Sequence, residues 1–303
     1  MNDQPSVSVV VLNWNGLQDT RECLQSLKAV SYPAFSVTVV DNGSEGGEAE
    51  ALRREFAGFA EVVALDENRG FAGGANAGIE RALEAGCGYV LLLNNDTVAD
   101  PAFLSEMVSA AEEIGPQFAA GSPTAYFYDR RDVIYSTGGS YSLWRGSARQ
   151  AGRGKRLPQL DERRAVERGY ADGVCMLVSR RAIERVGLLD EDYFNYWEET
   201  DWCARARQAG LRCYYLPKAK IWHKAARSQS PDPRFQYLYR RNALLFVRKR
   251  GNGLQFATAL LTHILFFGPL YLIKHPTKIA RVIPELRALL WHASNRKRQR
   301  PLV

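Results

Sequence analysis

The stretch VSVVVLNWNG, residues 7–16, decides the fold, because it joins a β-branched apolar run to polar side chains and a glycine. A run of this kind is typical of a strand that is buried on both faces of a parallel sheet. Comparable runs follow at residues 37–40, 62–65 and 89–93. Segments with apolar residues at helical spacing separate the four runs. This order predicts an α/β fold in which a mixed, mainly parallel sheet is flanked by helices.

Beyond these runs the pattern is less regular. Asp100 and Pro101 form an N-cap and N1 pair that predicts the start of another helix. Residues 125–170 are rich in glycine, arginine and scattered aromatics, which predicts long loops and short strands. Four later elements are expected: a strand at 173–179, a helix at 201–208, and strands at 213–216 and 221–223.

The composition favours a folded protein with anionic partners. Of the 303 residues, 46% are hydrophobic, enough for the core of one or two domains. Lysine and arginine outnumber aspartate and glutamate by 40 to 33, and the net charge of +7 favours phosphates or acidic lipid headgroups as partners. We expect no nucleic acid partner. Much of the basic charge lies at residues 145–168 and 234–300, the candidate contact surfaces.

Cysteine usage and the N-terminus indicate the compartment. The five cysteines form no CxxC pair and no dense framework, and an odd number suits a reducing compartment. We interpret them as buried thiols. The N-terminus, MNDQPSVSVVVLNWN, has no basic region before its apolar run, so it differs from a secretory signal. We therefore expect a cytoplasmic protein.

Residues 254–273 form the longest apolar stretch, about the length that spans a bilayer. Polar residues and the pair Gly268-Pro269 interrupt it, and basic residues flank both ends. Three interpretations remain open: a spanning helix, a kinked or interfacial helix near anionic lipid, and a buried helical hairpin. We favour the second, which predicts a peripheral protein at the inner face of the cytoplasmic membrane.

Polar side chains follow each of the four predicted strands. In an open α/β sheet, ligands bind beyond the carboxyl ends of the strands. One such cluster alone is commonly turn chemistry, but four clusters at one edge predict a ligand site. The clusters are Asn13, Trp14 and Asn15; Asp41, Asn42 and Gly43; Asp66, Glu67, Asn68 and Arg69; and Asn94, Asn95 and Asp96.

The segment NRGFAGGANAG, residues 68–78, places a cation and small residues before a predicted helix. Small residues in this position allow the backbone to approach a phosphate group. The GxGxxG spacing of dinucleotide-binding folds is absent, and no GxxxxGKS or GxxxxGKT loop occurs. A dehydrogenase and a P-loop enzyme are therefore disfavoured.

Two residues are candidate metal ligands. Asp96 follows a buried strand and could hold a divalent ion, which as a Lewis acid would neutralise a diphosphate leaving group. Its alternative role is that of a turn residue ahead of the next helix. His223 ends the run IWH and is the second candidate, with a structural histidine as the alternative.

The segment YWEETDW, residues 196–202, places three acids between two tryptophans at a predicted helix start. Acids in a first helical turn complement the helix dipole, which would explain any two of them. A carboxylate beside aromatic walls can also have a raised pKa and act as general base toward an attacking hydroxyl. We favour a general base among Glu198, Glu199 and Asp201.

Seven blocks of this sequence, in order, are similar to those of family 2 of the glycosyltransferases, the inverting GT-A type, and particularly of its bacterial rhamnosyltransferase-like members. They are VSVVVLNWNG, VVDNGS, NRGFAGGANAGI, LLLNNDT, DGVCMLVSRRAIERVGLLDEDYFNYWEETDWCARARQAG, IWHKAARS and YLYRRNALLFVRK, covering about residues 7–249. The resemblance implies a GT-A catalytic domain at residues 1–233, with a donor-binding half at 1–125 and an acceptor-binding half at 126–233. Residues 234–303 would form a helical, basic C-terminal region, a candidate for membrane association.

On the donor side, the resemblance implies that Asp41 contacts the base or ribose of a nucleotide. Asn94, Asn95 and Asp96 match the DxD motif, with Asp96 the metal-contacting member, and His223 matches a histidine that joins the metal site. The implied cofactor is Mg²⁺ or Mn²⁺. Asn94 replaces the first aspartate of DxD, so neutralisation of the metal charge rests on Asp96 and the diphosphate. The expected donor-binding residues are Asn13, Asn15, Asp41, Asn68, Arg69, Asn94 and Asn95.

On the acceptor side, Glu198 and Glu199 match the ED motif, whose second acid is the usual base. Glu199 is therefore the expected base and Glu198 the alternative, and glutamate stands at 199 where aspartate is commoner. Asp201 completes the expected catalytic set, with a place at the helix start or the acceptor site. The expected acceptor-binding residues are Asp172, Trp197 and Trp202.

The resemblance implies transfer of a sugar from a nucleotide-diphosphate donor to a hydroxyl of a glycan or lipid-linked glycan, with inversion, in cell-surface polysaccharide synthesis. dTDP-L-rhamnose is the expected donor, with UDP-hexoses and UDP-galactofuranose as alternatives. Two other hypotheses are a non-catalytic nucleotide-sugar-binding partner in a glycan assembly complex and a sugar-nucleotide nucleotidyltransferase. The nucleotidyltransferase would need a glycine-rich, lysine-bearing loop after the first strand, where NWNG stands.

Overall fold

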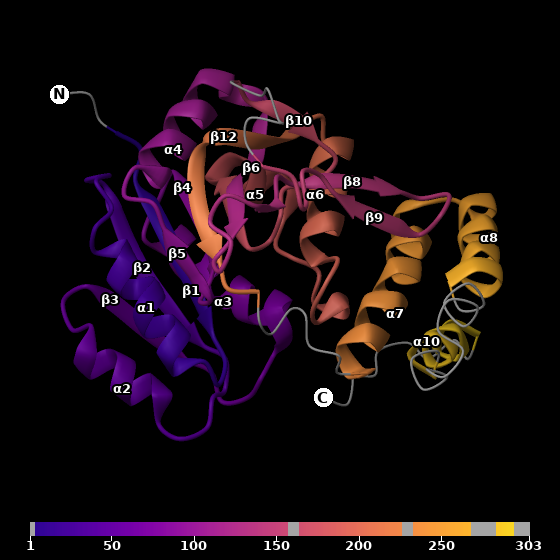
Figure 1. Ribbon diagram of the computed structural model, residues 1–303, viewed down its shortest axis with the longest axis horizontal. Helices are drawn as coiled ribbons and strands as arrows, with labels where there is room; N and C mark the ends of the chain where they lie inside the picture. Colours follow the sequence, from indigo (N-terminus) through magenta and orange to yellow (C-terminus); the bar gives the residue numbers. More distant parts are fainter. Residues whose placement is uncertain (1–3, 157–163, 226–232, 268–282, 294–303) are drawn as a thin grey trace.

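The computed structural model describes residues 4–156, 164–225, 233–267 and 283–293. A ten-stranded mixed sheet forms its centre, in the order β10-β12-β6-β11-β4-β1-β2-β3, with β5 beside β12 and β7 beside β6. Helices cover the sheet, and the C-terminal helices stand together at one side of the α/β body (Figure 1). The predicted α/β fold with flanking helices is confirmed.

The N-terminal half alternates strands and helices as predicted. Strands β1 to β4 are mutually parallel where they pair, and each lies within two residues of its predicted bounds. Asn13 pairs with Asp41 and Leu12 with Asn94, so the polar strand ends meet at one edge. The elements are β1 (Val7–Asn13), α1 (Leu17–Leu27), β2 (Phe35–Asp41), α2 (Glu48–Glu55), β3 (Ala60–Ala64), α3 (Gly70–Glu84) and β4 (Tyr89–Asn94).

Alternate strand side chains face two apolar layers. One layer packs against α1, α2 and α4, and the other packs against α3, α5 and α6. Two glycines bring α3 close to β1: a Cβ on Gly74 would lie 2.4 Å from Leu12, and one on Gly78 would lie 2.2 Å from Val10. These glycines of the NRGFAGGANAG segment therefore serve helix–sheet packing.

The second half adds antiparallel strands to the sheet. Strand β11 pairs antiparallel with β4 and β6, whereas β6 and β12 are parallel. Strands β8 and β9 form a separate hairpin. The elements are β5 (Thr97–Ala99), α4 (Phe103–Ile114), η1 (Gly115–Gln117), β6 (Phe118–Phe127), β7 (Ile134–Ser136), β8 (Gly139–Ser142), β9 (Ser147–Gln150), β10 (Val166–Arg168), β11 (Cys175–Ser179), α5 (Arg180–Val186), η2 (Glu191–Tyr193), α6 (Glu198–Gln208) and β12 (Arg212–His223).

Several boundaries in this half differ from prediction. Helix α4 begins at Phe103, two residues after Pro101, and α6 begins at Glu198, three residues before the predicted start. The two strands expected at 213–216 and 221–223 are one strand, β12, whose ladder with β6 is irregular between Leu216 and Lys220. That irregularity contains Pro217, which cannot donate to a ladder.

The C-terminal region is helical over its described residues, as expected. It contains α7 (Pro233–Arg250), α8 (Gly253–Thr262), the π-helix η3 (His263–Phe267) and α10 (Ile283–Ala293). Leu244 and Phe246 of α7 share an apolar cluster with Tyr193 and Trp197 of the α/β body. Within the ranges that the structure describes, no helix combines the length and apolarity needed to cross a membrane. Residues 268–273 of the apolar stretch lie outside those ranges.

Candidate active site

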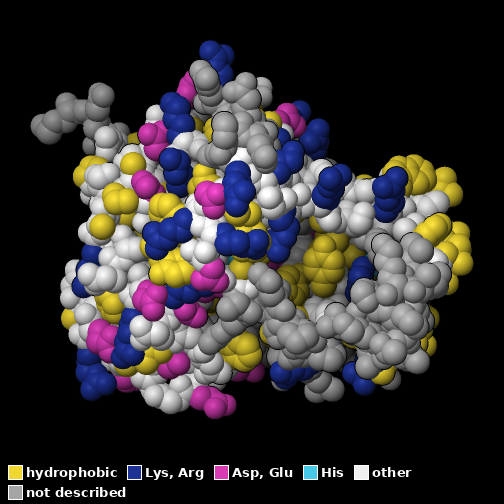
Figure 2. All heavy atoms as spheres, in the orientation of Figure 1, with side chains coloured by type: hydrophobic (Ala, Val, Ile, Leu, Met, Phe, Trp, Pro, Cys, Tyr) yellow, Lys and Arg dark blue, Asp and Glu magenta, His cyan; other side chains and the backbone are white. Residues whose placement is uncertain are grey.

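A cavity of about 580 Å³ lies between the strand ends of the α/β body and the C-terminal helices. Figure 2 shows the molecule hollowed between these parts, with hydrophobic side chains inside the hollow. Asn94 and His223, at the ends of β4 and β12, line the cavity together with Phe235 and Tyr239 of α7. The volume is that of a small-molecule site.

The predicted nucleotide residues form a buried hydrogen-bond network at the ends of β1 and β2. Nδ2 of Asn13 donates to Oδ1 of Asp41 at 2.6 Å and to Oε2 of Glu48 at 2.9 Å. Thr20 Oγ1 donates to Oδ1 of Asn13 at 2.7 Å, and Nδ2 of Asn95 donates to Thr20 Oγ1 at 2.9 Å. The amide of Asn13 is thus engaged within the protein, where it positions Asp41.

Asn42, which the sequence placed in a polar cluster without a role of its own, joins the second strand to the NRG segment. Its Nδ2 donates to Oδ1 of Asn68 at 3.1 Å and to the carbonyl of Gly70 at 2.9 Å. Its Oδ1 accepts from the backbone N–H of Arg69 at 2.9 Å. Gly70 has a φ of +72°, and a Cβ there would lie 2.3 Å from the carbonyl oxygen of Phe194. The segment is therefore held tightly beside Asp41.

The predicted donor residues divide between two places. Asn94 lines the cavity, whereas the others are not part of its lining. Those others lie at the ends of β1, β2 and β4 and before α3: Asn13, Asn15, Asp41, Asn68, Arg69 and Asn95.

Asp96 and His223, the predicted metal ligands, lie together. Strand β5 pairs with β12 so that Thr97 is opposite His223, which brings Nε2 of His223 to 3.1 Å from Oδ1 of Asp96. Both imidazole nitrogens are buried, and neither has hydrogen-bond geometry toward any described residue, including the Asp96 carboxylate that lies close to Nε2. Two neighbouring ligands of an octahedral ion with bonds of about 2.1 Å are separated by about 3 Å. The pair therefore fits two positions around one cation.

The described residues contain no group of three or more His, Cys, Asp or Glu side chains that could hold a metal ion. Asp96 and His223 therefore provide at most two protein ligands from this set. Any ion held there must take further ligands from elsewhere, such as phosphate oxygens or water.

Glu198 and Glu199 begin α6 and line the cavity. Oε2 of each is buried and accepts no hydrogen bond from the part of the chain that the structure describes. Burial raises the pKa of Glu198 well above its usual value, and the neighbouring Glu199 raises it further. Burial, and then the Asp172 carboxylate, raise the pKa of Glu199 to about 7. A carboxyl group with this pKa can accept a proton at neutral pH.

Asp172 also lines the cavity, and its carboxylate is held by three donors. Oδ2 accepts from Oγ of Ser136 at 2.5 Å and from Nε2 of Gln150 at 3.0 Å. Oδ1 accepts from the backbone N–H of Val174 at 3.1 Å. Asp172 is close enough for its charge to raise the pKa of Glu199, so the structure connects it with the acid pair.

The backbone before the acid pair is strained. Phe194, Tyr196 and Trp197 have φ values of 63°, 71° and 77°. Residues other than glycine rarely adopt positive φ values. They do so only where contacts with the surrounding structure stabilise this backbone conformation. The strained loop sets the direction in which Glu198 and Glu199 enter α6.

Helix α7 holds this loop. Asn242 is fully buried, and its Nδ2 donates to the carbonyls of Tyr193, Asn195 and Tyr196, each at 2.8 Å. Nη2 of the buried Arg241 donates to the carbonyl of Tyr193 at 3.0 Å. These contacts reach the loop from a helix more than 30 residues later in the sequence. The C-terminal region thus supports the acid pair.

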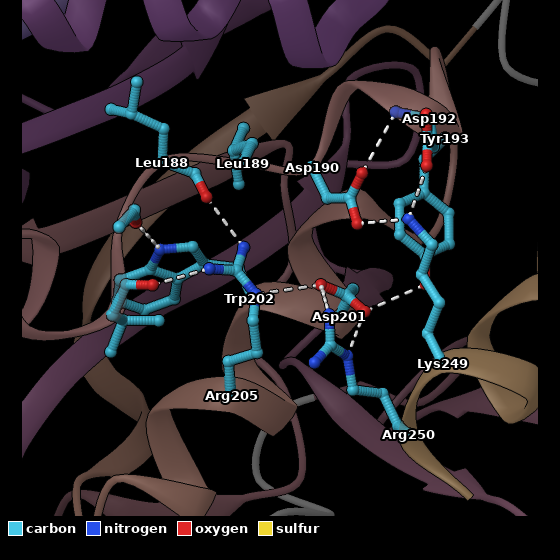
Figure 3. Close-up of polar contacts among 12 residues, drawn as sticks. Leu188, Leu189, Asp190, Asp192, Tyr193, Asp201, Trp202, Arg205, Lys249 and Arg250 are labelled. Atoms are coloured by element: carbon cyan, nitrogen blue, oxygen red, sulfur yellow. Dashed lines mark hydrogen bonds and ion pairs between the residues drawn. The ribbon is translucent and has the colours of Figure 1, made fainter. Parts of the chain in front are cut away.

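Asp201, predicted as part of the catalytic set, lies outside the cavity lining and is fully buried. Its carboxylate accepts from Nε of Arg205 at 3.0 Å, Nε of Arg250 at 2.6 Å and the hydroxyl of Tyr193 at 2.9 Å (Figure 3). Trp202, predicted to bind acceptor, is also absent from the lining, and its Nε1 donates to the carbonyl of Gly187. The structure thus places Asp201 and Trp202 in contacts within the protein and away from the cavity, whereas Trp197 does line the cavity.

Comparison with known proteins identifies the family. The model of Glycosyl transferase family 2 matches residues 8–187. The chain belongs to glycosyltransferase family 2. This family 2 glycosyltransferase is similar to N-acetylglucosaminyl-diphospho-decaprenol L-rhamnosyltransferase of Mycobacterium tuberculosis, with 27% identity over 265 residues, 81% of this chain and 85% of that one. It is also similar to a dTDP-rhamnosyl transferase of Shigella flexneri, with 24% identity over 224 residues, 70% and 71% of the two chains.

Solved structures share the fold of this family 2 glycosyltransferase. A mannosyltransferase of Pyrobaculum calidifontis in complex with GDP-Man and Mn²⁺ matches with a TM-score of 0.61 and 17% identity, covering 96% of this chain and 88% of that one. S. aureus TarS, residues 1–349, matches with a TM-score of 0.59 and 15% identity, covering 94% and 80%. At this identity the likeness concerns the fold, and the predicted GT-A fold is confirmed.

Several cavity residues were not predicted from the sequence. Phe235 and Tyr239 stand four residues apart, and residues at this spacing share one face of a helix. That spacing is a signal that would have found them. Tyr135 and Arg153 come from the irregular segment 125–170, which has no periodicity to point to them.

Proposed function

We propose that this family 2 glycosyltransferase transfers L-rhamnose from dTDP-L-rhamnose to a hydroxyl of a lipid-linked glycan, with inversion, in cell-surface polysaccharide synthesis. The two rhamnosyltransferase relatives support the sugar, and the diphospho-decaprenol named for the mycobacterial one supports the lipid. One observation carries the reaction type: Glu199, with its raised pKa, lines the same cavity as His223 of the candidate metal pair.

The proposed reaction is a single displacement. Glu199 accepts the proton of the acceptor hydroxyl as the oxygen attacks the anomeric carbon from the face opposite the diphosphate. The bond between that carbon and the diphosphate oxygen breaks, so the configuration inverts. Burial raises the pKa of both Glu198 and Glu199, and two adjacent buried charges would repel each other, so the pair would hold one proton when Glu199 acts as the base.

Asp96 and His223 would hold the divalent ion. The 3.1 Å between Oδ1 of Asp96 and Nε2 of His223 supports this, as does the lack of hydrogen bonds from the imidazole nitrogens to the described residues. When bound, Mg²⁺ or Mn²⁺ supplies Lewis-acid neutralisation of the departing diphosphate. A ligand set of one carboxylate and one imidazole suits Mn²⁺ better than Mg²⁺, which prefers oxygen. The remaining ligand positions would go to diphosphate oxygens and water.

One wall of the cavity is aromatic, which favours the proposal that the acceptor is a glycan. The Tyr196 ring lies 6.2 Å from that of Phe235 and 6.0 Å from that of Tyr239, and all three line the cavity. Aromatic rings offer large apolar surfaces with polar edges, to which the apolar faces of sugar rings can pack. We assign the acceptor glycan to this wall, next to the acid pair at the loop that carries Tyr196.

The position and surface of helix α10 favour the proposal that the acceptor is lipid-linked and lies at an anionic membrane surface. Pro284 and Glu285 of this helix line the cavity. Ile283, Leu286 and Leu290 of the same helix are 45%, 53% and 66% exposed. A cavity wall and an exposed apolar surface on one helix would bring a membrane-anchored acceptor to the acids.

A donor panel tests the proposal. The protein is incubated with MnCl₂ and dTDP-L-rhamnose, UDP-glucose, UDP-galactose or UDP-galactofuranose, with and without N-acetylglucosaminyl-diphospho-prenol, and released nucleoside diphosphate is measured. We expect release from dTDP-L-rhamnose that increases with the acceptor. Release from another donor alone would contradict the sugar. Release from no donor under any condition would contradict the enzyme function and favour the binding-protein hypothesis.

A further inference from the structure

One guanidinium group in the cavity has no carboxylate partner among the residues that the structure describes. Two arginines line the cavity, Arg153 and Arg240. Nε of Arg240 pairs with Glu285 at 3.1 Å. Arg153 makes no ion pair with any residue that the structure describes, and its Nη1 donates to the neutral Oε1 of Gln150 at 2.8 Å. Its positive charge is therefore available to a ligand.

Two aromatic rings hold Arg153 in place. Its guanidinium carbon lies 4.5 Å from the centroid of the Tyr135 ring and 5.3 Å from that of the Phe127 ring. Contacts at these distances are attractive, and stacking on a ring face leaves the N–H edge of a guanidinium able to donate. The packing orients a side chain that would otherwise move freely from an exposed turn.

The same Tyr135 ring connects Arg153 to the candidate metal pair. His223 contacts that ring edge-on, with 4.5 Å between the ring centroids. Arg153 and His223 are thus neighbours of one ring, and both line the cavity. A ligand that reached the ion between Asp96 and His223 would therefore lie within the surroundings of Arg153.

The other charged side chains that line the cavity are mostly acidic, so an anionic ligand there needs a nearby cation. Four acids line the cavity: Asp172, Glu198, Glu199 and Glu285. A diphosphate that enters this space needs positive charge to offset repulsion from the acids. Arginine matches phosphate oxygens with two parallel N–H donors, which lysine cannot do.

We infer that Arg153 binds a diphosphate in this cavity, beside Asp96 and His223. The inference rests on the proposed function, because the proposed reaction brings two diphosphates to the cavity: that of the nucleotide donor and that of a lipid-linked acceptor. The two sources share their chemistry, and binding and kinetic measurements separate them.

The test uses Arg153→Gln and Arg153→Lys, with Arg149→Gln as the matched control. Arg149 is an exposed arginine of β9, four residues before Arg153, and does not line the cavity, so its substitution removes the same charge without the contact. Binding of dTDP and of thymidine is measured by calorimetry in MnCl₂. The Michaelis constant is measured for a sugar acceptor carrying a prenyl diphosphate and for the same sugar as an alkyl glycoside.

If the donor supplies the diphosphate, Arg153→Gln binds dTDP about tenfold or more weakly, because a charge-assisted bidentate contact is lost. The dTDP affinity of Arg153→Lys lies between those of the wild type and Arg153→Gln. The dTDP affinity of Arg149→Gln and the thymidine affinity of every variant stay unchanged. If the acceptor supplies it, dTDP binding holds and the Michaelis constant rises for the diphosphate acceptor alone. Either pattern supports the inference.

Three results would overturn it. Arg153→Gln could bind dTDP and use both acceptors like the wild type, or it could weaken dTDP and thymidine binding equally, which would indicate a purely structural role. A wild-type protein that binds none of dTDP, UDP and GDP would reject the proposed function and this inference with it. The first two results leave the proposed function standing.

Discussion

At the scale of single residues, Glu199 is the acid whose surroundings suit proton transfer. Its pKa of about 7 and its position in the cavity predict that Glu199→Gln keeps dTDP affinity while kcat falls by about 10² or more. Calorimetry with dTDP and initial rates of dTDP release check the two parts. Glu198→Gln is the control: if it loses the rate and Glu199→Gln does not, the base is Glu198.

The raised pKa of Glu199 also predicts opposite effects of pH on rate and stability. Deprotonation through about pH 7 should increase kcat, with a plateau above. The folded state retains a proton that an unfolded glutamate releases above about pH 4.5, so stability from this group is present below that pH and is lost as pH rises toward 7. Glu199→Gln should therefore raise the melting temperature more at pH 8 than at pH 5. A difference that does not change with pH would contradict the assignment.

The pairing of Asp96 with His223 predicts how the ion supports ligand binding. Asp96→Ala should abolish turnover and the Mn²⁺-dependent thermal stabilisation by dTDP, because it removes the carboxylate ligand. His223→Ala should weaken the same stabilisation less severely. Melting temperatures with dTDP, with MnCl₂ and with both together measure the effect. Full activity of Asp96→Ala, or of the wild type in excess EDTA, would reject the metal mechanism.

Local sequence predicted the acids better than the residues that hold them. Asp96 and Glu199 were proposed from the sequence because a polar residue after a strand and acids at a helix start are local patterns, and the structure places each beside another proposed residue. Asn242 and Arg153 act through contacts with segments distant in the sequence, so no spacing within their own segments indicates a role. Asp201 and Trp202 look like site residues by proximity, but α6 turns them toward buried partners.

At the scale of elements, α7 determines the shape of the loop before the acid pair. Asn242→Ala removes a donor from each of three loop carbonyls, of which that of Tyr193 keeps Arg241 as a donor. The loss should cost about 1–3 kcal/mol of the free energy of unfolding. We also expect kcat to fall while dTDP affinity persists, because the loop leads directly into Glu198 and Glu199 at the start of α6. Urea unfolding, kcat and calorimetry measure these three quantities.

Asn252→Ala provides the control for this variant. Asn252 caps the neighbouring helix α8, where its side chain accepts from the backbone N–H of Gln255 at 2.9 Å. Loss of a cap costs about 0.5–2 kcal/mol and should leave kcat unchanged. If Asn242→Ala loses comparable stability and also keeps its kcat, the contacts of α7 do not position the acids.

The elements that the sequence predicted are those with a regular apolar pattern. Strands β1 to β4 show that pattern, and their bounds were close. Strand β6 was missed although all ten of its residues are buried, because Gly121, Ser122 and Pro123 interrupt its apolar run. Its burial comes from β11 and β12, which pair with it from later in the chain. Such a strand is defined by its neighbours more than by its own residues.

At the scale of the whole molecule, the cavity joins segments that lie far apart in the sequence, between residues 71 and 285. Strand ends supply Asn94 and His223, the first turn of α6 supplies Glu198 and Glu199, and α7 and α10 supply the far wall. The resemblance implied a division at residue 233, and side-chain contacts join the two sides of it: Arg250 pairs with Asp201, and Asn242 binds the loop. The C-terminal helices therefore belong to the structure of the site.

The exposed surface of those helices predicts binding to anionic membranes. Among the described residues, exposed large apolar side chains lie on α8, η3 and α10, apart from Trp144 and Tyr239. Exposed apolar patches of this kind mark interaction sites, and the net charge of +7 favours anionic lipid. We expect the protein to bind vesicles containing anionic phospholipid at low salt and to be partly released at high salt, because ions screen the attraction.

A comparison of Leu290→Glu with Ala57→Glu distinguishes vesicle binding through this apolar surface from binding through net charge alone. Leu290 is 66% exposed on α10, whereas Ala57 is an exposed residue that follows α2 in the N-terminal half. Both changes add one negative charge, so general electrostatic attraction should weaken equally, but only Leu290→Glu places that charge in the apolar surface. Co-sedimentation with vesicles at low salt should therefore fall much further for Leu290→Glu. Equal losses would assign binding to charge alone, and no binding by the wild type would mean that the surface serves another contact and that the lipid-linked acceptor loses its structural support.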